Sequence, residues 1–214
     1  MTEYHKIQTV FLRDPATNYR TLLAGQYARP EFGYLAGNRW QFTEKVDGTN
    51  IRVLWDAAAE TLSFRGKTDR AQIPPFLLDR LHDMFSLALF SAVFSDTDVA
   101  LYGEGYGARI QKGGGRYKPD GVDFVLFDVR VGDWWLKRED VEDVAQKLGI
   151  QPVPVLGYGT LPEMVEMVSA GFGSRWGDFC AEGIVARPVC ELADRDGQRI
   201  ITKLKCRDFG VGGV

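Results

Sequence analysis

Short apolar runs bounded by turn residues recur along the chain and predict β-strands. Each run is rich in aromatic or β-branched side chains, and glycine or polar residues stand near its ends. Runs of this kind cover residues 40–43, 51–55, 61–64, 99–102, 122–129, 134–136, 183–186 and 199–204. The strands do not alternate regularly with helices, which argues against a doubly wound parallel sheet.

Apolar side chains at helical spacing predict three helices. The first covers residues 74–94, and a second over residues 139–148 ends at a glycine. Thr160 and Glu163 form a capping-box pattern that opens a third helix, which stops at Gly171. Strands therefore outnumber helices, and an α+β fold is expected. The chain has no internal repeat and no linker-like segment, so a single domain is expected over residues 1–214.

The most informative segment runs from Glu44 to Asn50 and reads Glu-Lys-Val-Asp-Gly-Thr-Asn. It places Lys45 at the end of a predicted strand, where an ammonium group must lose water at a cost in free energy. Desolvation and neighbouring cations favour the neutral amine, which is a nucleophile. The alternative is a β-hairpin in which Asp47 and Gly48 form the turn and Lys45 is solvated.

Charged or aromatic residues stand beside the later predicted strands as well. They are Arg65, Glu104, Phe127 with Asp128, Glu182, Lys203 and Lys205. In this order, and after the segment Lys45 to Asn50, they resemble the motifs of the covalent lysine nucleotidyltransferases. This superfamily comprises ATP-dependent RNA ligases, DNA ligases and mRNA capping enzymes. The resemblance spans residues 45–205, and Thr49 with Asn50 is most similar to small phage-type RNA ligases.

The resemblance implies a nucleotidyltransferase (ligase adenylation) domain with largely antiparallel sheets flanked by helices. Related ligases usually carry an additional domain, whereas we expect no separate OB or C-terminal domain within residues 1–214. It also implies that Lys45 attacks the α-phosphorus of ATP, releases pyrophosphate and becomes a lysyl-AMP. The ATP-binding residues that it implies are Glu44, Lys45, Asn50, Arg65, Glu104, Phe127, Glu182, Lys203 and Lys205.

For three of these residues, physical chemistry supports a functional role and also a structural alternative. Lys203 and Lys205 alternate on one predicted strand, so their side chains face the same side. They suit the α-phosphate of ATP and would favour the neutral amine of Lys45; the alternative is an edge strand protected by lysines. Glu182 stands in a mainly apolar segment, so its carboxylate either pairs with a cation or binds Mg²⁺ or Mn²⁺.

The remaining implied contacts also have alternatives. Glu104 suits the ribose hydroxyls, or it is a carboxylate at a strand end. Arg65 suits the nucleotide or a 5′-phosphate, or it is an exposed hairpin arginine. Phe127 is expected to stack on adenine, although aromatic side chains in strands more often belong to the core.

Residues 106–118 form a basic, glycine-rich segment that also contains two tyrosines. Its cations are Arg109, Lys112, Arg116 and Lys118. Such a loop can follow a phosphate backbone while its aromatic rings stack on bases, so it is the predicted nucleic-acid or triphosphate contact. The alternative is a solvated surface loop.

Net charge, apolar runs and cysteine spacing limit the partners, compartments and metal sites that we expect. The net charge is −3, whereas proteins that bind nucleic acid through phosphate neutralisation are usually basic, so local patches must supply the contact. No apolar run has the length of a membrane span and the N-terminus has no signal pattern, so we expect a cytoplasmic protein without a membrane partner. Cys180, Cys190 and Cys206 form no CxxC pair, so neither a disulfide framework nor a zinc site is indicated.

One formal motif is rejected. Residues 103–108 match the glycine pattern of a dinucleotide fingerprint, but that fingerprint requires a helix to begin there. The glycines at 113–115 make such a helix improbable.

The sequence therefore predicts an ATP-dependent polynucleotide ligase that uses Mg²⁺ or Mn²⁺ and acts on RNA, either nicked duplex or RNA ends. It gives no indication of the oligomeric state. The alternatives are a DNA nick ligase, a capping-type guanylyltransferase, and a nucleotide- or RNA-end-binding module without sealing activity.

Overall fold

The computed structural model describes residues 3–212, which divide into two compact units. One unit contains residues 3–4 and 47–153, and the other contains residues 5–46 and 154–212. The chain passes from the second unit to the first between Val46 and Asp47, and returns after Val153. The expectation of one nucleotidyltransferase domain over residues 1–214 stays a prediction.

The unit of residues 5–46 and 154–212 is built on a five-stranded sheet in the order β1-β13-β12-β4-β11. Only the β1–β13 pair is parallel. The same unit also contains a two-stranded sheet formed by β2 and β3. The elements are β1 (Gln8–Thr9), β2 (Phe11–Arg13), η1 (Pro15–Thr17), β3 (Leu22–Tyr27), α1 (Pro30–Tyr34), β4 (Trp40–Glu44), β11 (Val155–Gly159), α5 (Leu161–Ala170), β12 (Gly183–Pro188), β13 (Thr202–Lys205) and η3 (Cys206–Phe209).

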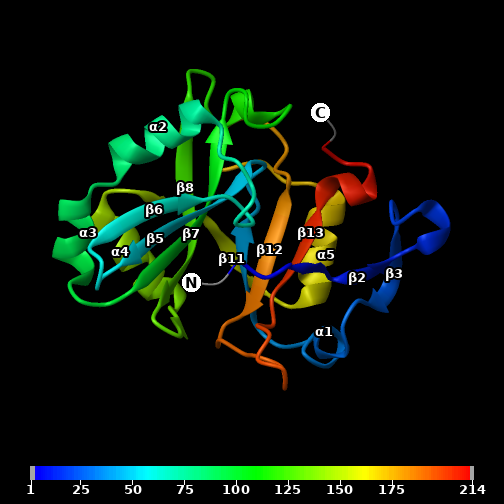
Figure 1. Cartoon of the computed structure of the whole chain (residues 1–214). Helices are drawn as coiled ribbons and strands as arrows, with labels where there is room; N and C mark the ends of the chain where they lie inside the picture. The colour runs from blue at the N-terminus through cyan, green and yellow to red at the C-terminus, as the bar shows by residue number, and fades with distance from the viewer. Residues whose placement is uncertain (1–2, 213–214) are drawn as a thin grey trace. The chain divides into compact units, whose positions relative to one another are not determined.

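Helix α5 covers one face of this sheet, where it lies along β12 and β13 (Figure 1). Its apolar residues Leu161, Met164 and Val168 are buried against Ile184 and Leu204 of the sheet. Because side chains alternate along β13, burying Leu204 on the helix face turns Lys203 and Lys205 to the opposite face. The core of this unit thereby determines which face carries the charged side chains.

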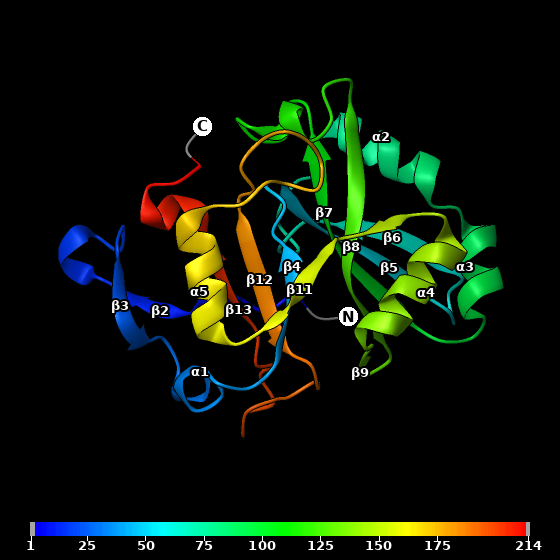
Figure 2. The same cartoon turned by 180° about the vertical axis from the view of Figure 1, so that it is seen from behind.

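The unit of residues 3–4 and 47–153 has a six-stranded sheet in the order β10-β8-β7-β5-β6, with β9 paired to β8. Figure 2 shows α4 against the part of this sheet that contains β8. Apart from the parallel β10–β8 pair, its strands are antiparallel. The elements are β5 (Thr49–Asp56), β6 (Thr61–Arg65), α2 (Pro75–Met84), α3 (Leu87–Phe94), β7 (Val99–Gly107), η2 (Gly114–Arg116), β8 (Val122–Val131), β9 (Trp134–Trp135), α4 (Arg138–Leu148) and β10 (Gln151–Pro152).

The predicted α+β class with largely antiparallel sheets is confirmed, and so are the two later helices. The capping box of Thr160 and Glu163 opens α5, and α4 ends at Gly149, whose φ is +67°. The rejection of the dinucleotide fingerprint is also confirmed, because residues 103–107 continue strand β7 and no helix begins there.

The alternative of a hairpin around Asp47 and Gly48 is wrong. Strand β4 pairs with β11 and β12, whereas β5 pairs with β6 and β7, so the strands on either side of Lys45 belong to different sheets. Gly48 has no positive φ and is required for another reason: a Cβ there would lie 2.3 Å from the carbonyl oxygen of Gly105. Glycine at this position lets the chain pass close to β7.

The helix predicted over residues 74–94 is broken into α2 and α3. Phe85 is extended, with φ −123° and ψ 120°, and its ring is buried in the core of the unit. Ser86 then serves as the N-cap of α3, because its hydroxyl accepts a hydrogen bond from the amide of Leu89 at 3.2 Å. The apolar residues keep helical spacing throughout residues 74–94, so the sequence pattern does not indicate this break.

All three cysteines are free thiols. Burial, and then the neighbouring Cys180, raises the pKa of Cys206 to about 12, so this thiol stays protonated. Among residues 3–212, none of the helices combines the length and apolar character needed to cross a bilayer.

We expect Ser86→Ala to lower the free energy of unfolding by about 1 kcal/mol, because α3 loses its N-cap. Urea unfolding measures the change. Ser91→Ala, at an exposed position of the same helix, is the matched control and should leave stability nearly unchanged. Equal effects of the two substitutions would show that the break is not held by this cap.

Candidate active site

Three strands of the five-stranded sheet bring Lys45, Glu182 and Lys205 together. Lys45 directly follows β4, Glu182 directly precedes β12, and Lys205 ends β13. Backbone hydrogen bonds fix these positions: the Lys45 amide donates to Gly183 at 2.9 Å, and the Cys206 amide donates to Glu182 at 2.9 Å. The three side chains, distant in sequence, therefore start from adjacent points of one sheet.

Glu182 accepts one ammonium group at each carboxylate oxygen. The Nζ atom of Lys45 lies 2.6 Å from Oε2, and the Nζ atom of Lys205 lies 2.6 Å from Oε1. The side chains are only 19%, 12% and 17% exposed for Lys45, Glu182 and Lys205 respectively. Two cations thus share one anion in a partly desolvated place, which leaves an excess positive charge and suits a phosphate group.

Lys203 lies two residues before Lys205 on β13, and both are half-buried on the same face. Strand register places Lys203 opposite Val185 on one side and opposite Thr9 on the other. The prediction that Lys203 and Lys205 face one side is confirmed. The alternative of an edge strand is wrong, because β13 lies between β1 and β12.

Glu44 directly precedes Lys45, and its side chain points to the opposite side of β4 from the side chain of Lys45. It is 1% exposed. Its Oε1 accepts a hydrogen bond from the Ser174 hydroxyl at 2.6 Å, and its Oε2 accepts one from the Arg175 amide at 2.8 Å. Burial raises the pKa of Glu44, and these two hydrogen bonds partly oppose that shift. The carboxylate therefore fastens the loop that leads to Glu182, and a contact with ATP stays a prediction.

Asn50 and Glu104 lie opposite each other on β5 and β7 in the six-stranded sheet. The Oδ1 atom of Asn50 is buried and has no hydrogen-bond partner among the residues that the structure describes. A Cβ on Gly48 would lie 2.7 Å from the Cγ atom of Glu104, so this glycine leaves room for the carboxylate side chain. A buried polar atom without a partner is rare in proteins, so the Oδ1 atom of Asn50 suits a ligand or water as its hydrogen-bond donor.

Phe127 lies at a β-bulge in β8. The register with β7 shifts by one residue there, so no residue of β7 is directly opposite Phe127. The Tyr4 ring lies 5.1 Å from the Phe127 ring, and the Tyr4 hydroxyl donates a 2.5 Å hydrogen bond to the buried carboxylate of Asp128. Bulges redirect side chains next to functional sites, and this one separates the half-buried Phe127 from its buried neighbours. Sequence reasoning missed Tyr4, which no local signal marks.

Arg65 ends β6 and is exposed, and its guanidinium donates to the carbonyl of Phe64 at 3.0 Å. Opposite it on β5, Arg52 is completely buried and was missed in the sequence. Arg52 donates to the carbonyl of Gly66 at 2.9 Å and pairs with Asp69 at 2.7 Å. The hydrogen bond from Arg52 lowers the pKa of Asp69, so this carboxylate stays ionised and holds the segment after Arg65.

The basic loop is attached to the segment that follows Lys45 in the chain. The Tyr117 hydroxyl accepts a hydrogen bond from the Asp47 amide at 3.3 Å, and the Gln111 side chain donates to the carbonyl of Gly48 at 3.0 Å. The loop is therefore fixed against Asp47 and Gly48, which follow Lys45 in the chain.

The four cations of this loop have different surroundings. Arg109 lies over the ring of Phe76, 4.3 Å from its centroid, and Lys118 pairs with Asp123 at 3.4 Å. Lys112 and Arg116 are exposed. The structure leaves these two side chains accessible to a bound polynucleotide.

Few of the described side chains near Glu182 could coordinate a divalent metal. Among the described residues, no cluster of three or more His, Cys, Asp or Glu side chains is arranged to hold a metal. Glu182 alone fits Mg²⁺ only if phosphate oxygens and water supply the other ligands, which is the usual arrangement for Mg²⁺ with a nucleotide.

Comparisons with solved structures connect this fold to known ligases. The Naegleria gruberi RNA ligase with pyrophosphate superposes with a TM-score of 0.66 at 19% identity, over 96% of this chain and 56% of that chain. A mutant of that ligase with ATP and Mn gives a TM-score of 0.67 at 17% identity, over 96% of this chain and 56% of that chain. A mutant with AMP and Mn gives 0.65 at 18% identity, with the same coverage of 96% and 56%. The chain thus spans just over half the length of these ligases, and the similarity concerns the fold.

No curated protein sequence matches the chain. The family model described as RNA ligase matches residues 38–205, which include every motif from Lys45 to Lys205. That match covers well over half of the chain and includes the strands that bring Lys45, Glu182 and Lys205 together, so the protein belongs to the RNA ligase family.

Proposed function

We propose that the protein is an ATP-dependent RNA ligase that works through a covalent lysyl-AMP. The observation that carries the proposal is the pairing of Lys45 and Lys205 with the two oxygens of Glu182. A lysine that only stabilised the fold would not require a second lysine on the same half-buried carboxylate. Membership in the RNA ligase family supports the same activity.

In the first step, the ammonium of Lys45 gives a proton to water, and the lone pair of the resulting amine attacks the α-phosphorus of ATP; the nitrogen releases a second proton to water as the new bond forms. A nitrogen–phosphorus bond forms, the bond from the α-phosphorus to the bridging oxygen breaks, and pyrophosphate leaves with the electron pair. Catalysis of this kind depends on in-line positioning and on cations near the developing charge. Lys205 and Lys203, on the same face of β13, are the residues that supply those cations.

In the later steps, AMP passes from Lys45 to a 5′-phosphate end of RNA. A 3′-hydroxyl then attacks that phosphate, the phosphodiester bond forms, and AMP leaves. We propose RNA as the substrate, either as a nicked duplex or as RNA ends.

The remaining predicted residues would bind the nucleotide. The unpaired Oδ1 atom of Asn50 supports a ligand next to β5, and the cross-strand neighbour Glu104 would accept hydrogen bonds from the ribose. Phe127 would stack on adenine, and Arg65 would contact a phosphate. Mg²⁺ or Mn²⁺, held by Glu182 together with phosphate oxygens, would stabilise negative charge on the reacting phosphate.

We expect Lys45→Ala and Lys45→Arg to abolish covalent labelling of the protein by α-labelled ATP. Alanine has no amine, and a guanidinium stays protonated and cannot attack. Acid-labile labelling with ATP, and separately with GTP, provides the measurement. Lys147→Ala, at an exposed position of α4, should label normally. Normal labelling of Lys45→Ala would contradict the proposed nucleophile, and labelling by GTP alone would indicate a capping-type guanylyltransferase.

We expect Glu182→Gln, Lys203→Ala and Lys205→Ala each to lower the rate of labelling by about a hundredfold or more, as loss of one transition-state charge contact does. EDTA should abolish labelling in the unmodified protein. Glu166→Gln, an exposed change on α5, is the control for removing a carboxylate charge. Labelling that is insensitive to EDTA, or near-normal rates in all three variants, would show that these residues only support the fold.

The basic loop generates a prediction about the substrate. Replacing Arg109, Lys112, Arg116 and Lys118 together by glutamine should weaken RNA binding and flatten its salt dependence, while labelling by ATP persists. The unmodified protein should seal an end with a ribose 3′-hydroxyl faster than an all-DNA nick, because the 2′-hydroxyl distinguishes RNA from DNA. Equal sealing of the DNA nick would indicate a DNA ligase, and loss of ATP labelling in the loop variant would assign the loop to the triphosphate.

A further inference from the structure

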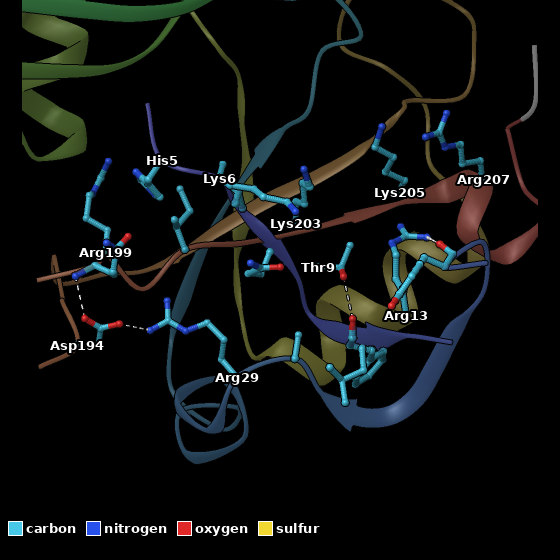
Figure 3. Close-up of a pocket in the computed structure, with 18 residues that line it drawn as sticks. His5, Lys6, Thr9, Arg13, Arg29, Asp194, Arg199, Lys203, Lys205 and Arg207 are labelled. Carbon is cyan, nitrogen blue, oxygen red and sulfur yellow. Dashed lines mark hydrogen bonds and ion pairs between the residues drawn. The ribbon is translucent and has the colours of Figure 1, made fainter. Parts of the chain in front are cut away.

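A broad groove of about 870 Å³ lies in the unit of residues 5–46 and 154–212 and is lined largely by cations (Figure 3). The basic residues of its lining are His5, Lys6, Arg13, Arg29, Arg199, Lys203, Lys205 and Arg207. Asp194 is the only carboxylate in the lining. Most of these cations lie outside the sequence motifs of the family, in residues 5–29, just before β13 and just after it.

The strand arrangement explains why the cations gather here. Strand β1 pairs in parallel with β13, with Thr9 opposite Lys203, so the segment that leads into β1 and carries Lys6 approaches the start of β13. Figure 3 shows Lys203, Lys205 and Arg207 following one another along β13 into η3. One row of positive charge therefore extends from Lys6 to Arg207.

Carboxylates hold the arginines of the groove in place. Arg13 donates to both oxygens of Asp208, at 3.0 and 2.8 Å, and Arg29 donates to Asp194 at 2.5 Å. These ion pairs fix the two guanidinium groups, so less conformational entropy is lost when they meet an anion.

The arginine pairs do not neutralise the groove. Lys6 and Arg207 are exposed, and neither side chain forms an ion pair with any described residue. Lys205 shares its carboxylate partner, Glu182, with Lys45. An excess of positive charge is therefore concentrated on this face, although the whole chain has a net charge of −3.

The shape and lining fit an extended anion better than a compact one. Pockets for small molecules are mostly apolar and enclose their ligand, whereas this groove has charged walls along its length. The ring of Tyr19, which is 61% exposed, also lines the groove and is available to stack on a base. Repeated cations with an accessible aromatic ring are the features by which proteins bind a single-stranded polynucleotide.

We propose that this groove binds the phosphodiester backbone of a single-stranded segment of the RNA substrate. Lys205 lines the groove and also pairs with Glu182, so a strand bound there ends beside the carboxylate that holds Lys45. The identification of the strand as the ligation substrate rests on the proposed function; the binding of a polyanion does not.

The test uses the charge-reversed variant Lys6→Glu with Arg207→Glu, because neither residue has a carboxylate partner to disturb. Arg70→Glu with Lys137→Glu is the matched control, since both residues are exposed and lie outside the groove. Anisotropy of a fluorescent single-stranded RNA is measured at several salt concentrations. The groove variant should bind at least about tenfold more weakly than the control at low salt, with a salt slope shallower by about 1.4, or 0.7 for each lost phosphate contact.

Covalent labelling by α-labelled ATP is measured on the same proteins and should persist in the groove variant. If the unmodified protein does not label, the proposed function fails, but the RNA-binding comparison still reports on the groove. Equal RNA binding by the two variants overturns the groove proposal. Unchanged RNA binding with lost labelling also overturns it and assigns the groove to the triphosphate. If the charge-reversed protein does not unfold cooperatively, Lys6→Gln with Arg207→Gln is compared with Arg70→Gln and Lys137→Gln on the same criteria.

Discussion

The carboxylate of Glu182, shared by Lys45 and Lys205, is the interaction on which the proposed chemistry of this protein depends. Each oxygen holds one ammonium at 2.6 Å in a place with little exposure to solvent. An ionised carboxylate compensates for burial of the lysines, and two lysines on one carboxylate leave positive charge for an incoming phosphate. The proposed nucleophile and a second cation that would bind the anionic substrate are thereby brought together.

The architecture of the five-stranded sheet maintains this arrangement. The three residues stand at neighbouring ends of β4, β12 and β13, and the core beneath α5 determines the face on which the lysines lie. Glu44, on the opposite side of β4, fastens Ser174 and Arg175 in the loop before Glu182. The same face of β13 continues into the basic groove, so the residues proposed for nucleotide chemistry and for strand binding share Lys203 and Lys205.

The sequence was informative where a physical requirement is local. Alternation along one strand predicted that Lys203 and Lys205 share a face, and the Thr160 and Glu163 pattern located the start of α5. The sequence did not predict features that depend on tertiary contacts. The bulge at Phe127, the hydrogen bond from Tyr4 to Asp128 and the burial of Arg52 depend on partners distant in the chain. The basic groove was missed because its cations come from both ends of the sequence and no spacing relates them.

The most direct test of the central claim is mass spectrometry of the unmodified protein after incubation with ATP and Mg²⁺, followed by peptide mapping. The account predicts one AMP added per chain, joined through an acid-labile bond to the side chain of Lys45 and absent when EDTA is present. An adduct on Lys203 or Lys205, or no adduct under conditions in which the folded protein binds ATP, would contradict the assignment of Lys45 as the nucleophile.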